Sequence, residues 1–424
     1  MPNSGAPISP DSELDALSRH IREESDGRGW VAQYQGLTLR TALQPIFSIS
    51  HKRTIGYEAL IRAFDPDQAA VLPGQLFQLP LNEPENVLLD RLCRYLHVRN
   101  FSGLSDEVNW LFLNVSPQAV AGGKRYDSFF GQLLRNTGFP PHRIVVEIVE
   151  QPTDNAEQLR NTVDYYRSLG CLTAIDDFGA GHSNFERIWN LRPDIVKLDR
   201  QMLLRATDDT RTRQIIKGIV TLLHQSGCLV LLEGVETREQ ALIAVDAGVD
   251  FVQGFFFQVP SLALDEVVNA AADFESLLTD YKHKSRQKFD PTQSIAGFFQ
   301  PYFDQAVQRL RDGMDPTRAC TSLLDHHTVS RCYLISEEGI QQGDTLVSPA
   351  LNDRLDPRFR PLENTSAADW YRQHYLHRAL SHHGQLQITR PYLSVTGAHM
   401  CVTLSRSFET RDGIYVLCCD IFAN

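Results

Sequence analysis

The sequence predicts an α/β fold, a modified (β/α)8 barrel of the TIM type with one antiparallel strand, followed by a smaller α+β domain. Short apolar runs rich in β-branched residues, such as 144–146 and 229–232, are typical of buried parallel strands. Stretches of helical length separate these runs. The polar residues that follow the runs are 20 to 36 residues apart, which brackets the roughly 30 residues of one strand-plus-helix unit.

The barrel is expected to begin near Leu37. An apolar run at residues 39–47 returns through His51-Lys52 to residues 55–57. This early hairpin would supply the antiparallel strand.

The clearest helix is expected at residues 212–225, with a stop signal at Gly227. One broad apolar face of this helix would contain Ile215, Ile216, Ile219, Val220, Leu222 and Leu223.

Beyond the barrel the chain becomes helical and then basic at residues 282–288, a run that is more often a solvated helix end or linker than a binding patch. An amphipathic helix at 295–310 and strand-like runs at 331–335, 399–404 and 413–419 follow. We therefore expect a polar N-terminal extension at 1–28 without assigned chemistry, the barrel at 29–262, a helical linker at 263–293 and an antiparallel α+β domain at 294–424.

Length and composition narrow the class of protein. The 424 residues exceed the roughly 250 of one barrel. A formal net charge of −11 argues against a general polyanion-binding surface, so we expect no DNA or RNA duplex as a partner. Without an apolar run of about 20 residues or a signal peptide, we expect no membrane span and a cytoplasmic location. The eight cysteines form no Cys-x-x-Cys pair and are expected to be buried free thiols.

Seven segments place polar residues where strands would end. The residues are Glu58, Asn114, Glu147, Asp176-Asp177, Lys197, Glu233 and Gln253. Five acidic groups at one barrel mouth would repel each other unless cations neutralised them, and oxygen ligands suit Mg²⁺ or Mn²⁺ better than zinc. Two such ions can catalyse in-line displacement at a phosphodiester. Taken singly, Asn114 would more often cap a helix than bind a metal, and Asp176-Asp177 could cap a turn, whereas a buried Lys197 requires carboxylate partners.

Over residues 37–262 these segments, in this order, resemble the EAL family of cyclic di-GMP phosphodiesterases, whose name is the triplet Glu58-Ala59-Leu60. The resemblance implies that Glu58, Asn114, Glu147 and Asp176 bind one metal ion, and that Asp176 and Asp177 hold a second. It implies catalytic roles for Lys197, Glu233 and Glu58, with Lys197 positioning the attacking water and Glu233 as a candidate base. Gln44, Leu60, Arg62 and Gln253 would bind or orient the substrate, and Glu150 and Glu236 would anchor the loop after Asp177.

The implied reaction is the opening of cyclic di-GMP by water, with Mg²⁺ or Mn²⁺, to the linear 5′-phosphorylated dinucleotide by a homodimer. One departure concerns the loop, which has Ala180 and His182 where active members usually have threonine and tyrosine. A receptor that binds cyclic di-GMP without cutting it is therefore the alternative from another class. An unrelated metal-dependent barrel hydrolase is a third hypothesis.

The C-terminal domain resembles the Cache or PAS-like sensor domains that follow some EAL domains. The resemblance rests on Asp369-Trp370-Tyr371-Arg372, Arg390-Pro391-Tyr392 and the strand-like run 402–405. It implies regulation of the barrel and a small-molecule ligand contacted by Trp370, Tyr371, Arg372 and Tyr392. Core aromatic residues with a salt-bridging arginine explain the same pattern equally well.

Overall fold

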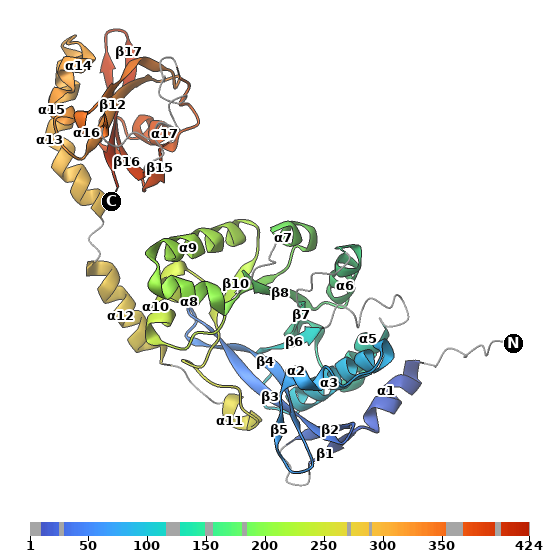
Figure 1. Ribbon diagram of the computed structural model, residues 1–424. Coiled ribbons are helices and arrows are strands. Elements are labelled where there is room, and N and C mark those ends of the chain that lie inside the picture. The colour runs from blue at the N-terminus through green and yellow to red at the C-terminus, as the bar shows by residue number, and fades with distance from the viewer. Residues whose placement is uncertain are drawn as a thin grey trace. The chain divides into compact units, whose positions relative to one another are not determined.

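The chain folds into two compact units, Met1–His283 and Lys284–Asn424 (Figure 1). The computed structural model describes residues 10–24, 29–115, 128–148, 156–179, 185–268, 273–287, 291–352, 368–394 and 400–423. The division between the units lies within the basic run 282–288. The four domain boundaries given above stay predictions.

Eight strands of the first unit close into a barrel. They are β3 (Leu37–Ser48), β4 (Arg53–Phe64), β6 (Trp110–Val115), β7 (Ile144–Ile148), β8 (Leu172–Phe178), β9 (Ile195–Leu198), β10 (Leu229–Leu232) and β11 (Phe251–Val252). From β4 to β11 the neighbouring strands are parallel, and β3 pairs antiparallel with both β4 and β11. The predicted barrel with one antiparallel strand is therefore confirmed.

Short strands extend the hairpin of β3 and β4 beyond the barrel. They are β1 (Ile21–Glu23) and β2 (Trp30–Tyr34) on the β3 side and β5 (Ala70–Val71) on the β4 side. Other elements flank the barrel, namely α1 (Pro10–Ser18), α2 (Pro73–Leu76), the 3-10 helix η1 (Pro141–Arg143), α11 (Leu264–Val268) and α12 (Phe274–Gln287).

The helices that follow the strands pack on the outside of the barrel (Figure 1). They are α3 (Glu83–Ser102), α5 (Ser128–Thr137), α6 (Ala156–Ser168), α7 (Phe185–Leu191), α8 (Arg200–Asp208), α9 (Thr210–Gln225) and α10 (Arg238–Ala247). On α9, Ile216, Val220 and Leu223 are buried, but Ile215 and Leu222 are 52% and 44% exposed. The broad apolar face predicted for this helix is thus wrong in width, because Ile216, Val220 and Leu223 belong to the buried core while Ile215 and Leu222 face solvent.

A separate apolar layer fills the inside of the barrel. Its members are Ile46, Phe112, Val145, Ala174, Ile195, Leu231 and Phe251. On β4 the corresponding position is Gly56, where a Cβ atom would lie 2.7 Å from the Phe112 ring. The glycine therefore leaves room for the Phe112 ring, which fills the apolar layer beneath the barrel mouth.

The second unit is built on one antiparallel sheet. Its strands are β12 (Val329–Ser336), β13 (Gln341–Val347), β14 (Gln387–Ile388), β15 (Tyr392–Leu393), β16 (Met400–Thr410) and β17 (Gly413–Phe422). Its helices are α13 (Pro291–Arg311), α14 (Pro316–Ala319), α15 (Thr321–Leu324), α16 (Pro349–Asn352) and α17 (His374–Ser381). The smaller α+β domain expected after the barrel is present.

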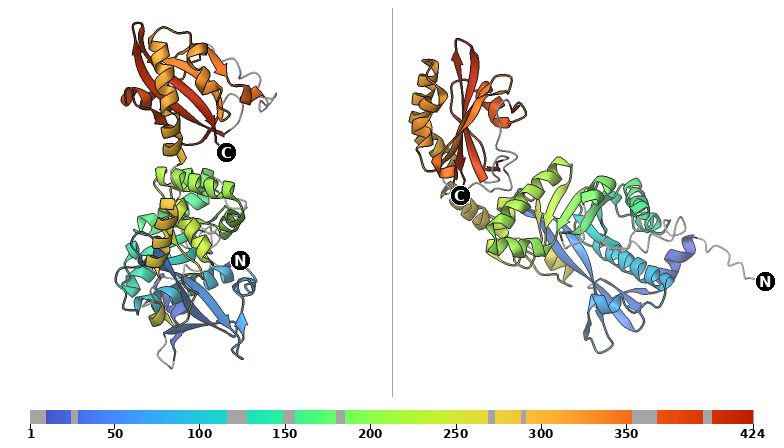
Figure 2. Two further views of the ribbon diagram at one scale, coloured as in Figure 1. Left: turned by 90° about the vertical axis from the view of Figure 1, so that its left-hand side faces the viewer. Right: turned by 45° about the horizontal axis from the view of Figure 1, so that its top comes forward.

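Helices cover both faces of this sheet, with α13 along one face and α17 on the other (Figure 2). Successive side chains of β17 point to opposite faces of the sheet, so that Cys419 packs with α13 and Cys418 packs with α17. All eight cysteines are free and buried, as expected. Among the described helices of both units, none is long and apolar enough to cross a membrane.

Candidate active site

A ring of polar residues lies directly above the apolar floor of the barrel. Side chains two residues apart on a strand point to the same face, so the residue two positions nearer the mouth also points inward. These positions are Gln44, Glu58, Asn114, Glu147, Asp176, Lys197, Glu233 and Gln253. Regular strand geometry thus brings together residues that lie up to 209 positions apart in the chain.

Lys197 on β9 occupies the centre of the ring and is 1% exposed. Its Nζ lies 2.6 Å from an oxygen of Glu147 and 2.6 Å from an oxygen of Glu233. Asp176 is 3.1 Å away and Glu58 4.0 Å. One ammonium group therefore faces four carboxyl groups, more negative charge than it can neutralise if all four are ionised.

Burial and these neighbours shift the pKa values of the cluster. Burial raises the pKa of the Glu147 carboxyl well above its usual range, and the Lys197 charge opposes this shift. Burial likewise raises the pKa of Glu233 to about 8. For Lys197, burial alone would lower the pKa, but the surrounding carboxylates outweigh it and hold the pKa well above its usual range. The ammonium group consequently keeps its charge at neutral pH.

Glu58 on β4 is held by amide groups on both sides. Asn114 Nδ2 donates to Glu58 Oε1 at 3.0 Å, and Gln253 Nε2 donates to Glu58 Oε2 at 2.8 Å. The Gln253 amide also donates to Gln44 Oε1 at 3.1 Å, and Gln44 donates to the Gln258 carbonyl at 3.3 Å. This chain of hydrogen bonds fixes the Glu58 carboxylate toward Lys197.

Gly254 allows the close backbone approach that places Gln253. A Cβ atom at Gly254 would lie 2.1 Å from the Val235 carbonyl oxygen. The Val235 N–H donates to the Gln253 carbonyl at 3.1 Å. Any larger side chain would therefore separate the segments after β10 and β11 and displace the Gln253 amide from Glu58.

The end of β8 forms a compact acidic group. One oxygen from each of Asp176, Asp177 and Glu233 lies within 4.8 Å of the others. Asp177 adopts a left-handed conformation with φ 54°, and burial raises the pKa of its carboxyl group. Glu147 Oε2 is buried and has no hydrogen-bond partner in the described part of the chain. Uncompensated hard oxygen donors at this density fit a divalent cation of the Mg²⁺ or Mn²⁺ type.

Leu60 and Arg62 share the inward face of β4 with Glu58 but lie nearer the rim. Arg62 lines a cavity of about 540 Å³ together with Arg40 and Phe64. Burial lowers the pKa of the Arg62 guanidinium, although Glu58 opposes this shift. Arg40 was not predicted as a site residue; its partner across the β3–β4 hairpin is Arg62, and it pairs with Glu24.

Glu236 lies outside the ring and accepts from Arg200 at 2.8 Å. Arg200 was not predicted from the sequence either. Its side chain packs against Gly234, where a Cβ atom would collide with it. The predicted loop anchor Glu150 and the departures Ala180 and His182 lie outside the described residues.

The four residues predicted to bind a sensor ligand are not gathered around one cavity. Trp370 and Tyr392 line a space of about 20 Å³, which holds about one water molecule. Trp370 donates to Gln341 and Tyr392 bonds to Thr403, whereas Tyr371 and Arg372 are exposed. The assignment of these four residues to a ligand stays a prediction.

Comparisons with known proteins agree with the barrel and its site. A family model described as the EAL domain matches residues 32–260. The cyclic di-GMP phosphodiesterase RocR of Pseudomonas aeruginosa is 31% identical over 225 residues, covering 51% of this chain and 56% of that protein. The probable cyclic di-GMP phosphodiesterase PdeA of Escherichia coli is 28% identical over 247 residues, covering 54% of this chain and 32% of that protein. The chain thus spans from about a third to just over half of the length of these relatives.

A solved structure matches both units. The Bacillus subtilis YkuI protein, which has an EAL domain and was crystallised with its substrate cyclic di-GMP and calcium, aligns with a TM-score of 0.74 at 21% identity. The alignment covers 98% of this chain and 100% of YkuI. At this identity the likeness concerns the fold.

Proposed function

Because the chain belongs to the EAL domain family, we propose that its barrel hydrolyses cyclic di-GMP to the linear dinucleotide pGpG, with Mg²⁺ or Mn²⁺ as cofactor. The observation that carries the proposal is the buried Lys197 ammonium, in contact with Glu147, Glu233 and Asp176 at the mouth of the barrel. Structural ion pairs are seldom arranged as one cation among four carboxylates, because the excess charge is costly to bury. A catalytic site accounts for that cost.

The residues proposed to hold the cofactor are those that the family resemblance implies. Glu58, Asn114, Glu147 and Asp176 would hold one ion, and Asp176 with Asp177 a second. Both would be bound through oxygen, which suits Mg²⁺ and Mn²⁺. When bound, the ions supply Lewis-acid stabilisation of the charge that develops on the phosphodiester.

The chain's own residues carry the remaining steps. Lys197 Nζ and a Glu233 oxygen are 2.6 Å apart, so a water molecule beside them can be oriented by the ammonium and can release a proton to the carboxylate. The water oxygen forms a new bond to phosphorus as the bond to the 3′ oxygen breaks, and that oxygen takes up a proton. Gln253 and Asn114 hold Glu58 in a fixed orientation, and Arg62 at the rim would contact a phosphate of the substrate.

The proposal extends to the whole chain as a homodimer regulated by its C-terminal unit. Glu236, to which the family resemblance gives the role of anchoring the loop after Asp177, is held by an ion pair with Arg200. In this proposal, a ligand or partner that binds elsewhere changes the activity of the barrel through that loop.

The test is to incubate the purified full chain with cyclic di-GMP and Mg²⁺ or Mn²⁺, and to follow pGpG by chromatography. Glu58→Gln keeps the shape of the side chain and removes its charge, so we expect no product from this variant. Glu107→Gln, an exposed carboxylate outside the ring, is the matched control and should keep wild-type turnover.

Wild-type turnover in Glu58→Gln, or in Lys197→Ala, would refute the catalytic assignment. Binding of cyclic di-GMP without any product from the wild-type chain would place the protein in the receptor class instead.

A further inference from the structure

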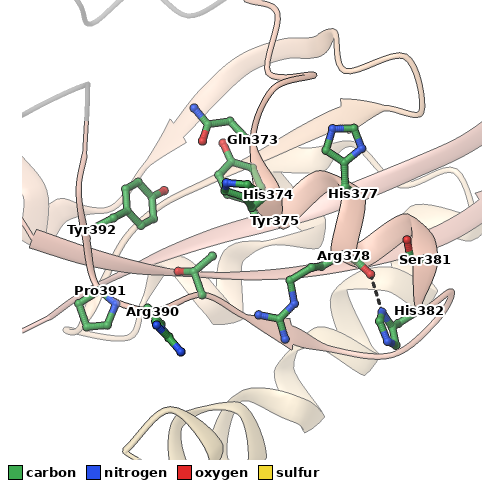
Figure 3. Close-up of a pocket in the computed structure, with 11 residues that line it drawn as sticks. Gln373, His374, Tyr375, His377, Arg378, Ser381, His382, Arg390, Pro391 and Tyr392 are labelled. Atoms are coloured by element: carbon green, nitrogen blue, oxygen red, sulfur yellow. Dashed lines mark hydrogen bonds between the residues drawn. The ribbon is translucent and has the colours of Figure 1, made fainter. Parts of the chain in front are cut away.

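The second unit contains a cavity of about 620 Å³ that is separate from the barrel site (Figure 3). One wall is helix α17, and the other is the segment of residues 389–392, which runs from the end of β14 to the first residue of β15. Of the four residues predicted to bind a sensor ligand, only Tyr392 lines it. The volume lies in the range of about 300 to 1,000 Å³ that is typical of small-molecule pockets.

Two arginines bring positive charge to this cavity. Arg378 enters from α17 and Arg390 from the opposite wall, and three histidines, among them His382, lie along α17 and its end. No carboxylate belongs to the described residues that line the cavity. In the sequence, residues 370–408 include four arginines and five histidines but no aspartate or glutamate. This local positive charge contrasts with the net charge of −11 for the whole chain.

The guanidinium groups lack acidic partners. Arg378 Nη1 donates to the Ile388 carbonyl at 3.2 Å, and its Nη2 lies 3.5 Å from the Gln387 amide oxygen. These contacts orient the group without neutralising its charge. Within the described part of the chain, neither Arg378 nor Arg390 forms an ion pair with a carboxylate. Guanidinium groups without an acidic partner favour a phosphate or carboxylate ligand.

Part of the lining is flat and apolar. The rings of Tyr375 and Tyr392 are stacked, with centroids 6.5 Å apart and planes inclined by 28°, and Pro391 continues the surface. Tyr375 is buried against the sheet and Tyr392 bonds to Thr403, so both rings are held in position. A planar ligand body could lie against this surface while its charged end meets the arginines.

We propose that this cavity binds a small organic anion, with its phosphate or carboxylate group between Arg378 and Arg390 and a planar body against Tyr375 and Tyr392. The inference concerns the second unit only and does not depend on cyclic di-GMP hydrolysis by the barrel.

Calorimetric titration of the full chain with phenyl phosphate, benzoate and phenol tests the proposal. A chelator keeps divalent cations away from the barrel, whose acidic mouth then repels anions. We expect at least one of the two anions to bind, and phenol, which has the ring without the charge, to bind about tenfold more weakly or not at all. Phenyl phosphate as the tighter ligand would identify the charged group as a phosphate, and benzoate would identify a carboxylate.

Variants assign the binding to this cavity. Arg378→Gln with Arg390→Gln should weaken binding of the anion by about tenfold or more, because both charge-assisted hydrogen bonds are lost. Arg411→Gln, an exposed arginine in the turn between β16 and β17, is the matched control and should bind as wild type. Arg390→Gln alone, at an exposed position, serves as a second variant if the double variant unfolds. Equal affinity in the cavity variants, equal affinity for phenol, or no binding of either anion would overturn the proposal.

Discussion

Gln253 illustrates how a single neutral side chain controls the charged site. Its amide donates to Glu58 and to Gln44, so it can satisfy both acceptors only as an amide. Gln253→Glu would remove the donor and set a second negative charge beside Glu58. A hydrogen bond to a charged group contributes about 1.5–3 kcal/mol, so we expect cyclic di-GMP turnover to fall by about 10- to 100-fold. Initial rates of pGpG formation check this. Gln225→Glu, at the exposed end of α9, should leave them unchanged, and normal rates in Gln253→Glu would contradict the role given to the amide.

The excess of carboxylates around Lys197 predicts that divalent cations stabilise the folded chain. An ion that binds only the folded state adds about 2.7 kcal/mol at a concentration of 100 times its dissociation constant. We therefore expect Mn²⁺ to raise the thermal midpoint of the barrel by several degrees and a chelator to reverse the effect. Asp176→Asn removes a charge shared by the acidic group and should abolish most of the shift. An equal shift in wild type and variant would mean that Mn²⁺ binds elsewhere.

At the scale of elements, the sequence was informative where burial imposes a pattern. Strands β7 and β10 lie between the barrel interior and the outer helices, so both faces must be apolar and the runs could be recognised. The polar ring could be predicted because every parallel strand ends at the same mouth. Arg40 could not be placed beside Arg62, since the register of the β3–β4 hairpin depends on an irregularity between Ile46 and Phe47. Such long-range pairing leaves little signal in one sequence.

The contact between α3 and β3 predicts a loss of stability in acid. His97 on α3 is buried, its Nδ1 lies 2.9 Å from Thr41 Oγ1, and Asn100 donates to the same oxygen. Burial, aided by the charge of Arg62, lowers the pKa of His97 from 6.5 to about 3. In the unfolded chain His97 takes up a proton near pH 6.5, whereas in the folded chain it stays neutral. Stability that is present at neutral pH is therefore lost as the pH falls from about 6.5 toward 3.

Urea unfolding at several pH values measures this effect. One proton of difference changes the free energy of unfolding by about 1.4 kcal/mol per pH unit. His97→Gln cannot take up that proton and should flatten the dependence between about pH 6 and 4, whatever its stability at pH 7. His142→Gln, in the 3-10 helix η1, is a control that should keep the wild-type slope. An unchanged slope in His97→Gln would show that another group is responsible.

For the whole molecule, each unit has its own buried core, so the two should unfold as separate transitions. The second unit also contains a buried ion pair, in which Arg331 Nε donates to Asp420 Oδ2 at 2.6 Å while Thr403 donates to the other carboxylate oxygen. Removing one partner of a buried pair leaves the other charge uncompensated, at a cost of about 3–5 kcal/mol. Asp420→Asn should therefore lower the midpoint of one transition and leave the other in place.

Differential scanning calorimetry with and without Mn²⁺ assigns the transitions. The ion should raise only the transition of the barrel, where Asp176, Asp177 and Glu233 cluster, and Asp420→Asn should lower only the other one. Asp412→Asn, in the exposed turn between β16 and β17, should move neither. If Asp420→Asn also lowered the transition that Mn²⁺ raises, the two units would be energetically coupled, because a local change in one would then destabilise the other. Regulation of the barrel by its C-terminal unit requires such coupling. If the two transitions are independent, the C-terminal unit can regulate the barrel only when a ligand or partner is bound.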